Sequence, residues 1–508
     1  MSIYMKIKYI IIFFIAGVLY RLWLIHLVPQ PFVYDQNQYL SVAWGILQHG
    51  LYADYSRLYG YGLLIAPFIK LFGLSNPFPW QLLQAILDTS SAFLVYFIGK
   101  KIFKTERAAF WGFILYLFNP FTSAYVGVML TEIAAIFFMV LVFFIYLHFL
   151  ETRKISLLLL LGFILGYFVQ VRPSFLYFTL LFLVWLLFLV CKTCKPNKRK
   201  VELRTAVIPS DPAQCGRAWE SFIRLPRHYA PRNDYCEIRD KVILCIILPI
   251  IYFIPFSYNI AANYKTFHQF AILSVDKFFF RDVYVSLIVD KVPRTSRDPY
   301  YFWPGEALYV WGVYSTPKTA IERKDMADKY FQLGMTIIKK DPLKFIVSRV
   351  RKMRYVWEKH YLFPYRLEST NAIINFLVYW TNAGFLVMAL FGLIMFARKR
   401  KNEKSWAEKQ FIYIIIFLFI YITLAHMFST GEERFSLPAY PFVFMFAGFG
   451  IYTLQNRLLG RYNKLRISQL SLRGPRRYVG GRGNLMKDSH APPMVIGVTR
   501  NDRGAKLV

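Results

Sequence analysis

Residues 9–28 read YIIIFFIAGVLYRLWLIHLV. The run is almost wholly apolar, and a helix of about 20 such residues crosses a hydrocarbon core about 30 Å thick. Similar runs recur along the chain, which is 56% hydrophobic and 19% aromatic and has a mean hydropathy of +0.37. Helices are the expected spanning form because each satisfies its own backbone hydrogen bonds in lipid. The predicted fold class is an all-α polytopic membrane protein.

The start of the chain resembles a signal peptide, because Lys6 and Lys8 precede the first apolar run. The run is too long for the apolar core of such a peptide, and no cleavage site of small residues follows it before Pro29. We therefore expect a retained first helix.

About ten membrane spans are predicted. They cover residues 9–28, 80–99, 108–124, 129–148, 155–171, 174–191, 242–258, 373–397, 410–427 and 437–455. The chain then divides into an N-terminal transmembrane module, a basic loop, one isolated span, a large outer loop, the C-terminal spans and a basic tail. The corresponding residues are 1–192, 193–241, 242–258, 259–371, 372–456 and 457–508, and the first outer loop is 29–79.

The formal net charge is +33. Four basic stretches, at residues 100–104, 195–200, 398–401 and 457–466, fall on one side of the predicted spans. Since lysine and arginine concentrate in cytoplasmic loops, both termini are expected in the cytoplasm. The charge indicates contact with anionic membrane lipids, and no nucleic-acid partner is predicted.

The two large outer regions are expected to contain helices that do not span. In 29–79, an apolar helical pattern begins at Tyr39 and another covers Gly62–Phe72, which predicts interfacial helices. In 259–371, two amphipathic helices are predicted at 319–339 and 342–359, the second with Asp341 as its N-cap. A basic cluster on this second helix is interpreted either as an interfacial or solvated face or as a contact for lipid phosphates. Its members are Arg349, Arg351, Lys352 and Arg354.

Acidic and arginine residues gather on the outer side, at the ends of several predicted spans. They are Asp35 with Gln36, Arg57, Glu132 after Thr131, Arg172 before Pro173, and Arg434 after Glu432 and Glu433. Each has an ordinary structural explanation, such as a helix cap, a turn or a local ion pair. Together they suit an anionic amphiphile, because the planar fork of arginine makes bidentate contacts with phosphate.

These motifs, in this order, resemble the GT-C class of membrane glycosyltransferases, and within it the protein O-mannosyltransferases and the lipid A aminoarabinose transferase. The resemblance covers about residues 1–190 and 242–455. The matching residues are Asp35-Gln36 with Tyr39, Arg57-Leu-Tyr-Gly60-Tyr61-Gly62, Asn119-Pro120 with Thr131-Glu132, Gly166 with Arg172-Pro173-Ser174, Asn263-Tyr264 with Phe267 and Phe270, and Arg434-Phe435 with Pro438 and Pro441.

The resemblance implies an enzyme that transfers a sugar from a polyprenyl-phosphate donor to an acceptor hydroxyl on the extracytoplasmic face, with inversion. Asp35 would be the general base, and Glu132 a second catalytic residue. The arginines Arg57, Arg172 and Arg434 would bind the donor phosphate. Tyr39, Tyr59, Tyr61 and Asn263 would line the substrate pocket. The acceptor is a lipid, a protein or a glycan.

Four positions depart from the family pattern. Gln36 replaces an acid, Gly62 a proline, Ala262 an arginine and Phe435 a tyrosine. With Gln36 in this place, the cofactor is unknown: Glu132 is available to a divalent metal, and the sequence does not require one.

Two other functions remain open. A transporter or flippase of lipid-linked sugars would also collect arginines around an amphiphile, but its ionisable groups are expected near the middle of the bilayer. A non-catalytic scaffold of the same fold would be compatible with Gln36 and the other departures.

Overall fold

The computed structural model of the protein describes residues 7–55, 57–192, 234–274, 278–288, 319–365, 372–398, 405–428 and 432–472. Every regular element in these ranges is a helix. The chain separates into two compact units at Gln455, and the larger unit, Met1–Gln455, carries the elements that build the site. The predicted loop 193–241 and the predicted tail 457–508 lie largely outside the described residues.

Eight of the described helices are long and apolar enough to cross a membrane, so the chain is a multi-pass integral membrane protein. They are α1 (Ile7–Leu27), α4 (Phe78–Phe103), α7 (Glu132–Thr152), α9 (Leu176–Lys192), α11 (Asp234–Phe267), α16 (Ala372–Arg398), α17 (Trp406–His426) and α18 (Tyr440–Leu472). Each coincides with a predicted span. The predicted total of about ten is not confirmed.

The predicted span 108–124 is wrong as one continuous helix. Helix α5 (Glu106–Leu117) ends after 12 residues, a length of about 18 Å that is too short for the hydrocarbon core. A separate turn, α6 (Pro120–Ser123), then begins at its own N-cap, where the side chain of Asn119 accepts a hydrogen bond from the backbone N–H of Thr122. The predicted span 155–171 is helix α8 (Ile155–Val171), with 17 residues.

Neighbouring spans pack through two clusters of buried side chains. One cluster joins α7, α8 and α9 to α17 and α18, and the other joins α2, α3, α4 and α5. Helices α8 and α11 approach most closely at Gly166, where a Cβ atom would lie 2.0 Å from the carbonyl oxygen of Tyr252. Small residues permit such contacts between helices in lipid, and here they fix α11 against the bundle.

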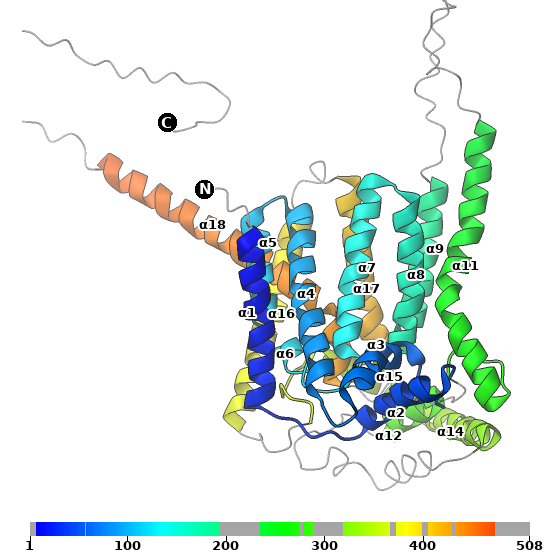
Figure 1. The fold of residues 1–508 in the computed structure, drawn as a ribbon. Helices are drawn as coiled ribbons and strands as arrows, with labels where there is room; N and C mark the ends of the chain where they lie inside the picture. The colour runs from blue at the N-terminus through cyan, green and yellow to red at the C-terminus, as the bar shows by residue number, and fades with distance from the viewer. Residues whose placement is uncertain are drawn as a thin grey trace, which may run out of the picture. The chain divides into compact units, whose positions relative to one another are not determined.

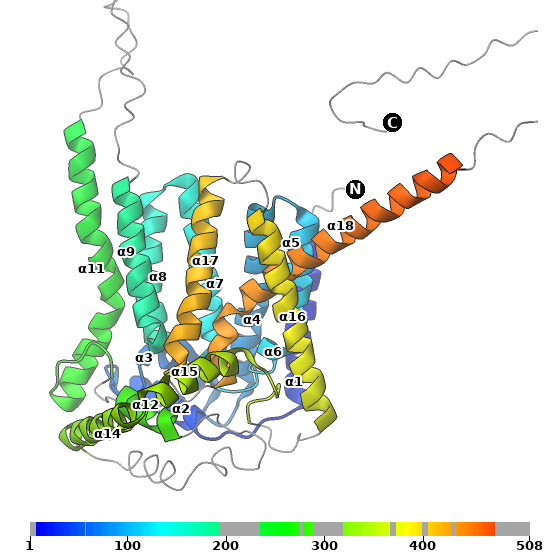
Figure 2. The same ribbon diagram turned by 180° about the vertical axis from the view of Figure 1, so that it is seen from behind.

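Five helices lie across the ends of the spans, at the end of the bundle where α1 finishes and α4 begins (Figures 1 and 2). They are α2 (Asp35–His49), α3 (Tyr59–Phe72), α12 (Phe278–Ile288), α14 (Ala320–Lys340) and α15 (Pro342–Trp357). We call this the Asp35 end, and the opposite one the Lys104 end. Helix α15 begins as its sequence predicts: the carboxylate of Asp341 accepts a hydrogen bond of 2.9 Å from the backbone N–H of Lys344.

Candidate active site

Asp35 is the first residue of α2, and its neighbours in the chain hold it in a defined place. Tyr34 before it has φ 55°, a left-handed conformation that is uncommon for a bulky residue. Such conformations persist where the surrounding structure determines them, often at functional sites. As the first residue of α2, Asp35 also lies at the N-terminal, positive end of the helix dipole.

Two arginines bind the carboxylate of Asp35. Arg57 NH2 lies 2.8 Å from Oδ1, and Arg434 NH2 lies 3.2 Å from Oδ2. These side chains are between 14% and 20% exposed, so the pairs are partly shielded from water. Arg57 also donates to the side-chain oxygen of Gln38 over 2.6 Å. Residues distant in the sequence thus meet at Asp35, as the common sidedness of the motifs predicts.

A second carboxylate, Glu132, joins the same cluster. It opens α7, and its Oε1 lies 2.9 Å from Arg172 NH1 and 3.7 Å from Arg434 Nε. Arg172 also donates to the hydroxyl of Thr131 over 2.8 Å. Glu132 is 1% exposed, and within the described part of the chain its Oε2 has no hydrogen-bond partner.

Arg434 connects the two halves of the cluster. Besides Asp35 and Glu132, it pairs with Glu432 over 2.5 Å. The result is a continuous chain of alternating charges, Arg57–Asp35–Arg434–Glu132–Arg172. Burial lowers the pKa of the Arg57 guanidinium, but Asp35, Tyr39 and Asp54 together outweigh this effect, and the net pKa is raised. Arg57 therefore keeps its charge.

Two of the four predicted pocket residues lie beside this chain of charges. The guanidinium of Arg57 lies over the ring of Tyr39, 5.1 Å from its centre, and that ring is 5.2 Å from the ring of Tyr61. The Tyr61 hydroxyl donates to Gln84 over 3.0 Å, and burial raises its pKa well above the ordinary value. Tyr61 therefore remains a neutral hydrogen-bond donor.

The other two predicted pocket residues make different contacts. The Tyr59 hydroxyl donates to the carbonyl of Pro255 over 2.6 Å, which ties α3 to α11. Asn263 donates to the carbonyls of Ala271 and Leu273, over 3.0 and 2.7 Å, in the turn after α11. These bonds give both residues a part in fixing α11, and the structure does not connect them to the charge chain.

Comparison with known proteins gives one match. Residues 59–208 match the family model described as dolichyl-phosphate-mannose-protein mannosyltransferase. The GT-C resemblance is confirmed. The matched residues, less than a third of the chain, include Glu132 and Arg172, whereas Asp35 and Arg434 lie outside them. No curated protein matches the chain in sequence.

Two glutamine side chains, not predicted from the sequence to have a structural role, hold the segment that leads into Glu132. Gln36 is 1% exposed; it donates to the carbonyl of Pro31 over 3.0 Å and accepts from the backbone N–H of Met129 over 2.8 Å. Gln84 donates to the carbonyls of Val126 and Val128, each over 2.9 Å. The departure at Gln36 thus has a structural reason: an amide both donates and accepts, whereas a carboxylate only accepts.

A third group, also missed, fixes the segment that carries Arg434. This segment is the 3₁₀ helix η4 (Glu433–Ala439), and Glu433 accepts from the backbone N–H and pairs with Nδ1 of His360, both over 2.8 Å. Lys359 donates to the Ser436 hydroxyl over 2.8 Å. The adjacent acids therefore differ in role, since Glu432 pairs with Arg434 and Glu433 binds the end of α15. In the sequence, the position of Glu433 directly before Arg434 was the signal that could have indicated a role for this acid.

An ion pair deep in the bundle was also missed. Arg21 of α1 and Asp88 of α4 are fully buried and 2.7 Å apart. Asp88 accepts further hydrogen bonds from the hydroxyls of Tyr116, over 2.5 Å, and Thr122, over 3.2 Å. Arg21 donates to the carbonyl of Leu117 over 3.0 Å. One charged residue inside each of two apolar runs could have indicated this ion pair from the sequence.

The charge chain does not fit a divalent cation. In the described ranges, no group of three or more His, Cys, Asp or Glu side chains has the arrangement of a metal site. The carboxylates of Asp35 and Glu132 are already bound by guanidinium groups, which repel a cation.

Proposed function

We propose that this protein is a GT-C glycosyltransferase that transfers a sugar from a polyprenyl-phosphate donor to an acceptor hydroxyl on the extracytoplasmic face, with inversion. The observation that carries the proposal is the continuous charge chain Arg57–Asp35–Arg434–Glu132–Arg172. Arginines suit a phosphate, and a carboxylate among them suits a hydroxyl that must lose its proton.

The reaction assigns each charged group a part. As the acceptor oxygen bonds to the anomeric carbon, Asp35 takes the hydroxyl proton. The bond from that carbon to the phosphate oxygen breaks, and polyprenyl phosphate leaves with the electron pair. Arg57 and Arg434 stabilise the negative charge that develops on the phosphate. Arg172 and Glu132 hold Arg434 and the mouth of α7 in position.

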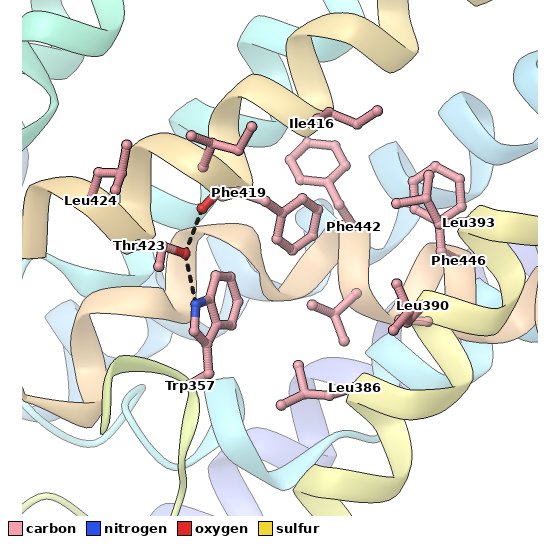
Figure 3. A pocket seen from close by; sticks show the side chains of 13 residues that line it. Trp357, Leu386, Leu390, Leu393, Ile416, Phe419, Thr423, Leu424, Phe442 and Phe446 are labelled. Atoms are coloured by element: carbon pink, nitrogen blue, oxygen red, sulfur yellow. Dashed lines mark hydrogen bonds between the residues drawn. The ribbon is translucent and has the colours of Figure 1, made fainter. Parts of the chain in front are cut away.

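An apolar cavity supports a lipid-linked donor. It has a volume of about 590 Å³ and lies between α16, α17 and α18 (Figure 3). Its lining is almost entirely aliphatic and aromatic, and Trp357 closes one side with a hydrogen bond of 2.9 Å to Thr423. Two residues after Trp357, Lys359 contacts η4, which carries Arg434. We propose that the hydrocarbon chain of the donor occupies this cavity.

The distribution of basic residues supports an extracytoplasmic site. The Lys104 end carries Lys100 and Lys101 in the last turn of α4, and Lys104, Arg153 and Lys154 in its short connections. Because such residues favour the cytoplasmic side, the Asp35 end is expected on the other side, with both termini in the cytoplasm.

Neither alternative function gains support of its own. The candidate residues for substrate contact lie at the ends of spans, whereas transport sites are typically near the middle of the bilayer. The deep pair Arg21–Asp88 is occupied by its own hydrogen bonds. Gln36, which was compatible with a non-catalytic scaffold, makes hydrogen bonds that hold the segment before Glu132.

The direct test is Asp35→Asn, assayed with a radiolabelled polyprenyl-phosphate sugar and the membrane fraction as acceptor. Loss of the base is expected to lower transfer by about a hundredfold or more. The matched control is Asp54→Asn, because Asp54 accepts from the backbone N–H of Arg57, and an amide oxygen can do the same. Full turnover by a correctly folded Asp35→Asn variant would rule out Asp35 as the base.

A further inference from the structure

On helix α15, two basic side chains face the bundle, whereas large apolar side chains face outward. The residues that it buries against the bundle are Arg349, Lys352 and Val356. Four large apolar side chains point outward instead, with exposed fractions of 70% for Leu343, 56% for Ile346, 50% for Val347 and 58% for Val350. A helix packed on a protein in water shows the reverse arrangement.

The inward charges have partners at the ends of other helices. Arg349 donates to the hydroxyl and the carbonyl of Ser286, each over 2.8 Å, and Lys352 donates to the same carbonyl over 2.7 Å. Ser286 is in the last turn of α12, whose carbonyls carry partial negative charge. The basic cluster predicted for α15 is therefore divided: Arg349 and Lys352 fasten the helix to the protein, and Arg351 and Arg354 remain outside.

The outward apolar stripe adjoins surface that faces lipid. Helix α15 crosses the end of α17 (Figure 2), and Arg349 donates to the carbonyl of Met427, just beyond that end, over 3.3 Å. Helix α17 itself exposes Ile416, Ile420 and Leu424 along its length. The apolar surface of a membrane span therefore continues toward α15.

Positive charge accompanies the stripe. Lys344, Arg351 and Arg354 are exposed on α15, and Lys339 and Lys340 are exposed at the end of the preceding α14. Among the described residues, Asp341 caps α15, and Glu358 pairs with Arg354 over 2.8 Å. Apolar side chains beside exposed lysine and arginine are the pattern of a helix in the surface layer of a bilayer that contains anionic lipid.

We propose that α15 lies in the surface layer of the bilayer, with Leu343, Ile346, Val347 and Val350 among the acyl chains and the outer basic side chains at anionic headgroups. The membrane then holds the helix from outside while Arg349 and Lys352 hold it from inside. The proposal depends on the membrane character of the chain and not on the proposed reaction, so its test needs no substrate.

The test places an environment-sensitive fluorophore on Val347→Cys, after serine replaces the five native cysteines. The protein is reconstituted in nanodiscs of phosphatidylcholine and phosphatidylglycerol. We expect blue-shifted emission, quenching by lipid that carries bromine high on its acyl chains, and no quenching by aqueous iodide. The control is Asp325→Cys, on the exposed polar stripe that α14 forms with Glu322, Lys329 and Gln332, where iodide should quench.

Each other outcome overturns the proposal. Quenching of the Val347 label by iodide would place the stripe in water. Emission that neither quencher affects would show that protein covers the stripe, either another segment of the chain or a second copy. Val350→Cys, on the same stripe, repeats the measurement if the first variant does not fold.

A second arm tests the charges. Replacing phosphatidylglycerol by phosphatidylcholine is expected to shift the emission of the Val347 label toward that of water, because the basic side chains lose their anionic partners. Lys344→Gln with Arg351→Gln should remove this dependence on lipid. Equal emission in both lipids, in the presence of the native basic residues, would overturn the headgroup contact.

Discussion

At the scale of single residues, the ion pairs between arginines and carboxylates define the site. Arg57 and Arg434 take one oxygen each of Asp35, and Arg172 takes Glu132. The ion pairs that fix the position of the Asp35 carboxylate also occupy its oxygens, so an acceptor hydroxyl must share them with the guanidinium groups.

The substitution Arg57→Gln tests the proposed phosphate contact. The KM for the donor should rise, because a charge-assisted contact with the phosphate is lost. Arg153→Gln, at the Lys104 end, is the control and should leave this KM unchanged. An unchanged KM in Arg57→Gln would contradict the phosphate contact.

The residue scale also shows what the sequence can predict about the site. The cluster of Asp35, Arg57 and Arg434 was predictable because sidedness places charged span ends together, whatever their distance along the chain. The contact of Gln36 with Met129 was not, because it joins residues 93 positions apart through a backbone N–H that no pattern marks. Tyr59 was assigned to the pocket from its motif, but its hydroxyl bonds to α11.

At the scale of elements, the break between α5 and α6 is the feature that hydropathy did not reveal. The apolar run continues through Asn119 and Pro120, so its average looks like one span. Asp88, which lies outside this run, stabilises the break by accepting hydrogen bonds from the hydroxyls of Tyr116 and Thr122. In contrast, the start of α15 was predictable because its cap, Asp341, is local.

Breaking the buried pair at this junction should destabilise the protein strongly. Asp88→Asn keeps the shape of the side chain but leaves Arg21 buried without its counter-charge, at a cost of about 3–5 kcal/mol. Arg21→Met with Asp88→Leu should cost less than the two single substitutions added together. Thermal unfolding in nanodiscs measures both, with the exposed Lys154→Gln as control. An Asp88→Asn variant as stable as the native protein would show that the pair contributes little.

At the scale of the whole molecule, the two ends of the bundle differ in charge chemistry. The Lys104 end carries lysines paired with acids, such as Lys104 with Glu408 over 2.6 Å, while the Asp35 end carries arginines around carboxylates. The lysines and arginines in the loops made it possible to predict from the sequence which ends of the spans share a side. The number of spans could not be predicted, because a short helix such as α5 has the composition of a longer one.

Two exposed positions test this orientation in intact cells. Ser75→Cys, between α3 and α4, should react with a membrane-impermeant maleimide added outside. Lys154→Cys, between α7 and α8, should react only after the membrane is permeabilised. The reverse pattern would place the candidate site in the cytoplasm and would contradict the proposed face of action.

The double hold on Asp35 has one more consequence, for the moment at which the base becomes available. A donor phosphate that binds Arg57 and Arg434 takes over guanidinium N–H groups that otherwise hold the carboxylate, which frees its oxygens to accept another hydrogen bond. On the proposed function, the acceptor hydroxyl then finds its base available only where the donor is already bound. Proton transfer is thereby confined to the complex that contains both substrates.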